Sequence, residues 1–104
     1  MLKITPDPKF TTEVKITVPG VAEPVTVKLT FKYRTRKEML TFLESEKEKQ
    51  LPETIANDVV LGWDGFDAEF SKENLSLFLE NYPAAAMEIW VEYNRQLYES
   101  RVKN

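Results

Sequence analysis

The chain has 104 residues, of which 42% are hydrophobic and 30% are charged, and its formal net charge is −3. This composition is typical of one globular domain and excludes a disordered chain. The sequence has no cysteine and no histidine. Disulfides, zinc sites that need thiolate or imidazole, and a Ser-His-Asp triad are therefore excluded.

The same charge balance argues against nucleic acid as a partner. Proteins that bind nucleic acid draw most of their affinity from lysine and arginine on the phosphates. The local basic cluster, residues 32–37, carries no recognisable binding motif and is interpreted as a solvated strand end. We therefore expect no nucleic-acid partner.

Residues 1–9 contain two prolines and no long apolar run. They predict an extended arm and do not resemble a signal peptide. Nowhere does the chain approach the ~20 consecutive apolar residues of a membrane span. We expect a soluble, intracellular protein that does not interact with membranes.

Two segments that follow alternate between apolar and polar residues with a period of two, which predicts half-buried strands. They span residues 10–18 and 25–33, and prolines at both ends of residues 19–24 indicate a loop between them. We expect an antiparallel hairpin over 10–33. The residues on its apolar face are Phe10, Thr12, Val14, Ile16 and Val18 in the first strand, and Val25, Val27, Leu29, Phe31 and Tyr33 in the second.

Helical signals begin at residue 35. Thr35 and Glu38 fit a capping box, with Thr35 as the N-cap. The apolar residues of this first helix have helical spacing and are followed by a polar stretch, residues 44–50. A second helix is predicted from Pro52 onward, with its end near Gly62.

Two further helices are predicted after residue 70. Ser71 is the expected N-cap of the third helix, and Pro83 separates it from a long final helix. The predicted fold class is therefore α+β, an N-terminal antiparallel hairpin followed by a bundle of about four helices. We expect a single domain over residues 1–104, with the helical part over 35–103.

The stretch from residue 61 to 75 concentrates glycines, aromatic residues and acidic residues, so it is the first place to look for chemistry. An EF-hand loop needs glycine at its sixth position and glutamate at its twelfth. Counting from Asp64 places Glu69 at position six, and counting from Asp67 places Lys72 there. Both registers fail, so no calcium site is predicted.

Other site chemistry fails in this stretch as well. The three glycines of the chain form neither a dinucleotide-binding nor a P-loop pattern. Paired carboxylates are common by chance in a chain this charged, and catalysis by them needs a cleft and a shifted pKa. We predict no catalytic residue, cofactor or metal. The stretch is interpreted as a corner between two helices, whose members are Gly62 and Gly65 at the turns, Trp63 and Phe66 as apolar plugs, and Ser71 as the next N-cap.

The organisation of the chain resembles the small tail assembly chaperones of long-tailed bacteriophages and prophages. The resemblance covers residues 10–104 in organisation and is most distinctive over residues 58–104. It rests on a Val-Pro-Gly turn in the hairpin, on Gly62-Trp63 followed by Phe66-Asp67, on the Asn81-Tyr82-Pro83 break, and on a long final helix ending in Lys-Asn.

The resemblance implies a non-enzymatic protein that binds the tape measure protein while the tail tube is built around it. It also implies self-association, contact with the tail tube protein as a further partner, action in the host cytoplasm and absence from the finished virion. A minor tail or neck protein, structural or adaptor, is the alternative that we keep open.

A chaperone of this kind needs an apolar surface for its client, and an amphipathic client helix would lie in a groove. The final helix has apolar residues on more than one face, which favours a second contact besides the core. Core packing remains the simpler interpretation of each single residue. The candidate partner-binding residues are Trp90, Tyr93, Leu97 and Tyr98 on the final helix, and the face of the hairpin is a further candidate surface.

Overall fold

A computed structural model describes residues 1–99 of the chain. In this range it contains a three-stranded antiparallel sheet and four helices, so the α+β class, the hairpin and the number of helices are confirmed. The end of the predicted helical part, residues 100–103, lies outside the described residues. The elements are β1 (Lys9–Ile16), β2 (Val25–Lys32), α1 (Arg36–Glu46), α2 (Leu51–Ala56), β3 (Val60–Asp64), α3 (Lys72–Asn81) and α4 (Ala85–Tyr98).

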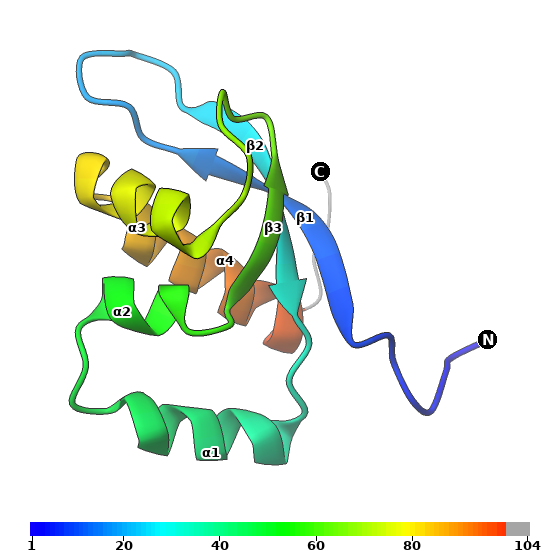
Figure 1. The fold of residues 1–104 in the computed structure, drawn as a ribbon. Coiled ribbons are helices and arrows are strands. Elements are labelled where there is room, and N and C mark those ends of the chain that lie inside the picture. Colours follow the sequence, from blue (N-terminus) through cyan, green and yellow to red (C-terminus); the bar gives the residue numbers. More distant parts are fainter. Residues whose placement is uncertain (100–104) are drawn as a thin grey trace.

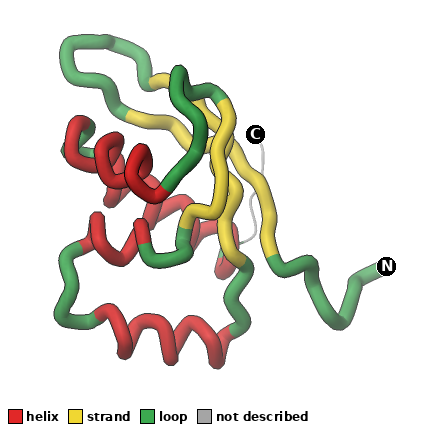
Figure 2. The backbone as a smooth tube through the Cα atoms, in the orientation of Figure 1, coloured by secondary structure: helices red, strands yellow, loops and turns green. Residues whose placement is uncertain are grey.

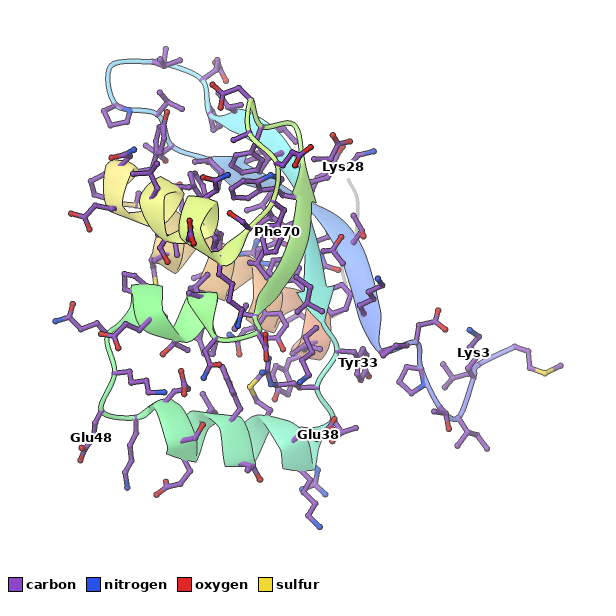
Figure 3. The ribbon with its side chains drawn as sticks, in the orientation of Figure 1. Lys3, Lys28, Tyr33, Glu38, Glu48 and Phe70 are labelled. Carbon is purple, nitrogen blue, oxygen red and sulfur yellow. The ribbon has the colours of Figure 1, made fainter. Side chains whose placement is uncertain are left out.

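The sheet has the order β1-β2-β3, and α3 and α4 lie together on one of its sides (Figures 1 and 2). In the hairpin Phe10 is opposite Phe31 and Val14 is opposite Val27. The predicted alternation holds, because the even-numbered residues of β1 and the odd-numbered residues of β2 face the core. Lys28 projects from the other face, away from the helices (Figure 3).

The strand β3 corrects the sequence prediction of a helix over residues 52–63. The helix α2 ends at Ala56, because Asp58 adopts the left-handed conformation with φ of 60° and turns the chain back toward the sheet. Gly62 then lies opposite Thr30, and Trp63 lies opposite Leu29. The fold is therefore not a hairpin followed by a pure helical bundle.

The two predicted side-chain N-caps are confirmed. The Thr35 hydroxyl accepts a hydrogen bond from the Glu38 amide at 3.1 Å, and the Glu38 carboxylate accepts one from the Thr35 amide at 2.9 Å. At α3, the Ser71 hydroxyl accepts from the Asn74 amide at 3.0 Å. Each cap satisfies amides that have no partner within their own helix.

A buried guanidinium links the sheet to the helices. Arg34 Nη1 donates to the Asp58 carbonyl at 2.9 Å and to the Tyr93 hydroxyl at 3.1 Å. The Tyr93 hydroxyl in turn donates to the Lys32 carbonyl at 2.8 Å. The guanidinium carbon lies 3.7 Å from the centre of the Phe42 ring in α1. We call Arg34, Tyr93 and Phe42 the arginine hub.

A second buried charge, Glu46, ends α1. Its Oε2 atom accepts hydrogen bonds from Lys49 at 2.9 Å and Asn57 at 3.0 Å. Burial raises the pKa of Glu46, but the hydrogen bonds from Lys49, Asn57 and Ser45 outweigh burial and hold the pKa below its ordinary value. The carboxylate thereby joins α1 to the turn that precedes β3.

Candidate functional site: an aromatic groove beside the hairpin

A groove of about 460 Å³ runs between the loop end of the hairpin, the segment 65–71 and the helix α3. Figure 2 shows the segment 65–71 passing from β3 to the start of α3. We call this hollow the aromatic groove. Its apolar lining consists of Ile16, Val18, Val25 and Val27 from the hairpin, Trp63, Phe66 and Ala68 from β3 and the loop, and Leu77, Phe78 and Tyr82 from α3 and its end.

Stacked rings form one wall of the aromatic groove. Trp63 and Phe66 stack with ring centres 3.9 Å apart and planes at 13°, and the Phe66 ring meets Phe78 edge-on at 5.0 Å. Phe70, which lies between α3 and β3 in Figure 3, meets Trp63 edge-on at 5.3 Å. Tyr82 continues the row beyond Phe78 at 5.5 Å. Such offset and edge-on pairs are the favoured arrangements of aromatic side chains.

Local hydrogen bonds fix the loop that carries these rings. The Trp63 indole nitrogen donates to the Ala68 carbonyl at 2.9 Å, and Asn74 Nδ2 donates to the Glu69 carbonyl at 2.9 Å. Gly65 has a φ of +94°, a conformation that other residues adopt at a cost, and its position also lies close to the backbone of Val27. The groove wall is therefore held in place by its own loop.

The five predicted corner residues lie in β3 and in the segment 65–71 that follows it. Gly62 and Trp63 belong to β3, so the prediction that Gly62 ends a helix is wrong. Gly65 provides the turn, and Phe66 folds back onto Trp63 as a plug. Ser71 begins α3 as expected. The corner joins a strand to a helix, because β3 pairs with β2 where the helix was expected to continue.

The charges around the aromatic groove are mostly negative. Asp67 lines the groove and Glu69 lies on the same loop, whereas Asp64 is the register partner of Lys28 on the opposite face of the sheet. The next basic residue, Lys72, has its ammonium group 3.6 Å from the Asp58 carboxylate. Across residues 1–99 no group of acidic side chains is arranged to hold a metal ion. The groove thus offers aromatic and aliphatic surface with an acidic rim, an arrangement suited to binding apolar side chains with basic neighbours.

The predicted partner-binding residues lie on α4, away from the lining of the aromatic groove. Tyr93 is fully buried in the arginine hub, where its hydroxyl donates to the Lys32 carbonyl. Trp90 and Leu97 are partly buried against the core, and Tyr98 is exposed. A contact of Trp90, Tyr93, Leu97 or Tyr98 with a client stays a prediction.

The groove residue Leu77 was missed from the sequence, whereas Val18 and Val25 belong to the apolar hairpin face that the alternation predicts. Leu77 is on the exposed side of α3, outside the apolar stripe that the helical spacing reveals, and its side chain is 57% exposed. The hairpin residues come from a distant part of the chain. One signal could have found Leu77, namely a large apolar residue that the helical stripe does not explain.

Comparison with known proteins assigns the chain to a family. A family model described as phage tail assembly chaperone matches residues 1–104. Comparisons with curated proteins and with solved structures give no match. No helix within residues 1–99 has the length and apolar character needed to cross a membrane. The matching family is non-enzymatic, which confirms the prediction that the protein is not an enzyme. The chain belongs to the phage tail assembly chaperone family.

Proposed function

We propose that the protein binds the tape measure protein during tail assembly and that the aromatic groove receives an amphipathic helix of this client. Membership of the family implies partners among the tail proteins. The observation that supports this groove as the contact site is its exposed apolar lining. Leu77 on the helical wall of the groove is 57% exposed, and Val25 on the hairpin wall is 46% exposed.

A helix suits the groove for geometric reasons. The two walls of the groove are the helix α3 and the end of the hairpin, with a row of aromatic rings between them. A client helix therefore needs its apolar side chains along one face. Covering apolar surface is worth about 25 cal/mol per Å². Several partly exposed apolar side chains meeting the client at once can therefore supply a usable affinity without a polar contact.

The acidic rim adds a requirement on the client. Asp67 in the lining and Glu69 on the same loop favour a helix that carries lysine or arginine beside its apolar stripe. Charges of this kind chiefly accelerate the encounter and set orientation. Binding should therefore weaken at higher salt without being abolished, since the apolar contact persists.

The test measures binding of the tape measure protein encoded with this chain, in successive fragments, by calorimetry. Leu77→Glu should weaken binding by at least about tenfold, because it places a charge in the apolar contact. Leu40→Glu is the matched control, since Leu40 is 62% exposed on α1 and lies outside the groove lining. Equal affinity of both variants for every fragment would refute the groove as the contact site.

The wider proposal includes tail tube protein as a further partner, action in the host cytoplasm and absence from the finished virion. It also keeps Trp90, Leu97 and Tyr98 as a second client surface. The runner-up, a minor tail or neck protein, differs in one respect that is simple to observe. Mass spectrometry of purified particles should lack this chain if it acts as a chaperone, whereas a stoichiometric amount would favour the runner-up.

A further inference from the structure

The strand β1 has an edge that no other strand of the described residues covers. The Tyr33 amide donates to the Pro8 carbonyl at 2.9 Å, so the even-numbered residues of β1 direct their amide and carbonyl groups toward β2. The odd-numbered residues 9, 11, 13 and 15 therefore direct theirs toward the open edge. Thr17, next in this series, donates its amide to the Glu88 carboxylate of α4 at 3.0 Å.

The two edges of the sheet differ in their fitness for pairing. The outer strand β3 has 5 residues, and its register with β2 shifts between Thr30 and Phe31. The strand β1 has 8 residues in an uninterrupted register with β2. An edge that is long and regular is a ready template for another strand, and β1 is that edge.

The charges on β1 indicate which kind of strand could pair with its open edge. On the exposed face Asp64, Lys28 and Glu13 are register partners across the three strands, so their charges alternate in sign. Within residues 1–99 neither Glu13 nor Lys15 forms an ion pair. A second β1 strand can continue the alternation by placing its own Lys15 beside Glu13. We propose that two copies of the chain pair antiparallel through β1, with Glu13 of each copy opposite Lys15 of the other.

The register follows from this pairing. It places Val14 of both copies on the twofold axis and brings together the outward amide and carbonyl groups of Glu13 and Lys15. Sliding the second strand by one hydrogen-bonding step sets Glu13 opposite itself. A further step sets Lys9 opposite Lys15. Both of these alternatives juxtapose like charges, which destabilises a strand pair. One more step sets Lys9 opposite Glu13, and the variant Lys9→Glu distinguishes that register from the proposed one.

Apolar surface lies beside the same axis. A groove of about 1010 Å³ runs along β1 and α4, and its lining includes Met87 and Val91, which are 57% and 43% exposed. A twofold axis perpendicular to the sheet leaves the α4 helices of both copies on one face of a continuous six-stranded sheet. Met87 and Val91 of the two copies would then cover one another, which adds burial to the backbone pairing.

Sedimentation velocity of charge-reversed variants tests the proposal. The wild-type chain should be a dimer, and Glu13→Lys and Lys15→Glu should each be monomeric at the same concentration. Mixing these two variants should restore a dimer, because at the paired positions 13 and 15 one copy then carries two glutamates and the other two lysines. Lys9→Glu is the matched control and should dimerise like the wild type, since Lys9 lies beyond the paired residues in this register.

Other outcomes would overturn the proposal. A wild-type monomer at high micromolar concentration, or a dimer that survives both single reversals, would exclude β1 pairing between copies. Dissociation by Lys9→Glu and Glu13→Lys but not by Lys15→Glu would assign a register in which Lys9 faces Glu13. A monomeric wild type whose binding to the tape measure protein is lost in Glu13→Lys would assign the edge to a client strand instead. Circular dichroism checks that each variant is folded.

Discussion

The Tyr93 hydroxyl is the most informative single group to remove. It is fully buried, donates to the Lys32 carbonyl at 2.8 Å and accepts from Arg34 at 3.1 Å. The substitution Tyr93→Phe keeps the ring, including its stacking on Phe31 at 5.2 Å. It leaves one carbonyl and one guanidinium N–H contact without a partner.

The magnitude follows from these two bonds. A neutral hydrogen bond contributes about 1 kcal/mol to the free energy of unfolding, and one to a charged group contributes about 2 kcal/mol. Part of this loss is offset in the variant, because it has no hydroxyl to remove from water on folding. We therefore expect Tyr93→Phe to lower the free energy of unfolding by about 2 kcal/mol. For a domain of this size that corresponds to a fall in Tm of about 10 °C.

Urea denaturation followed by circular dichroism measures the effect, with the denaturant slope unchanged between variants. Tyr98→Phe is the matched control on the same helix, because Tyr98 is exposed and its loss should cost less than about 0.5 kcal/mol. If Tyr93→Phe were as stable as Tyr98→Phe, the arginine hub would contribute nothing to stability and the reasoning would be refuted.

Two further predictions concern the groove wall and the buried carboxylate. Trp63→Ala removes the stack on Phe66 and should lower the free energy of unfolding by about 2 to 3 kcal/mol. This loss is smaller than for a fully buried tryptophan. An unchanged Tm together with lost client binding would instead make Trp63 a contact residue. Because folding lowers the pKa of Glu46, its stabilisation is present above the unfolded pKa near 4.5 and is lost as the pH falls through the lower folded pKa. Glu46→Gln should therefore flatten the loss of stability on acidification, whereas the exposed Glu48→Gln should follow the wild type, and parallel curves for all three proteins would contradict this role.

Local patterns predicted most of the fold correctly. The alternation in β1 and β2 and the caps at Thr35 and Ser71 depend on residues close in sequence, so the sequence alone sufficed to find them. The strand β3 was missed because Val59 and Val60 are both buried and show no alternation, while Pro52 and Gly62 mimic the limits of a helix. The turn signal in Asn57-Asp58 and the β-branched pair after it were the available evidence for a strand.

The candidate site could be predicted only in part. The sequence pointed to Trp63 and Phe66 as packed aromatic residues, and they do stack. It could not place the hairpin end opposite α3, because that proximity follows from the way the helices pack on one side of the sheet. Tyr93 was chosen as a contact residue from its helical stripe, and its side chain is buried in this structure, so a contact with a client stays a prediction.

The arginine hub has a consequence for how the molecule comes apart. Its guanidinium joins the end of β2, the turn before β3 and the middle of α4 through one charged group. Pulling the sheet away from α4 would leave the guanidinium charge in an apolar interior without its hydrogen-bond partners, which is strongly unfavourable. Partial separation of the sheet from the helices is thereby suppressed, and the two parts should lose their amide protection against solvent exchange in a single cooperative event.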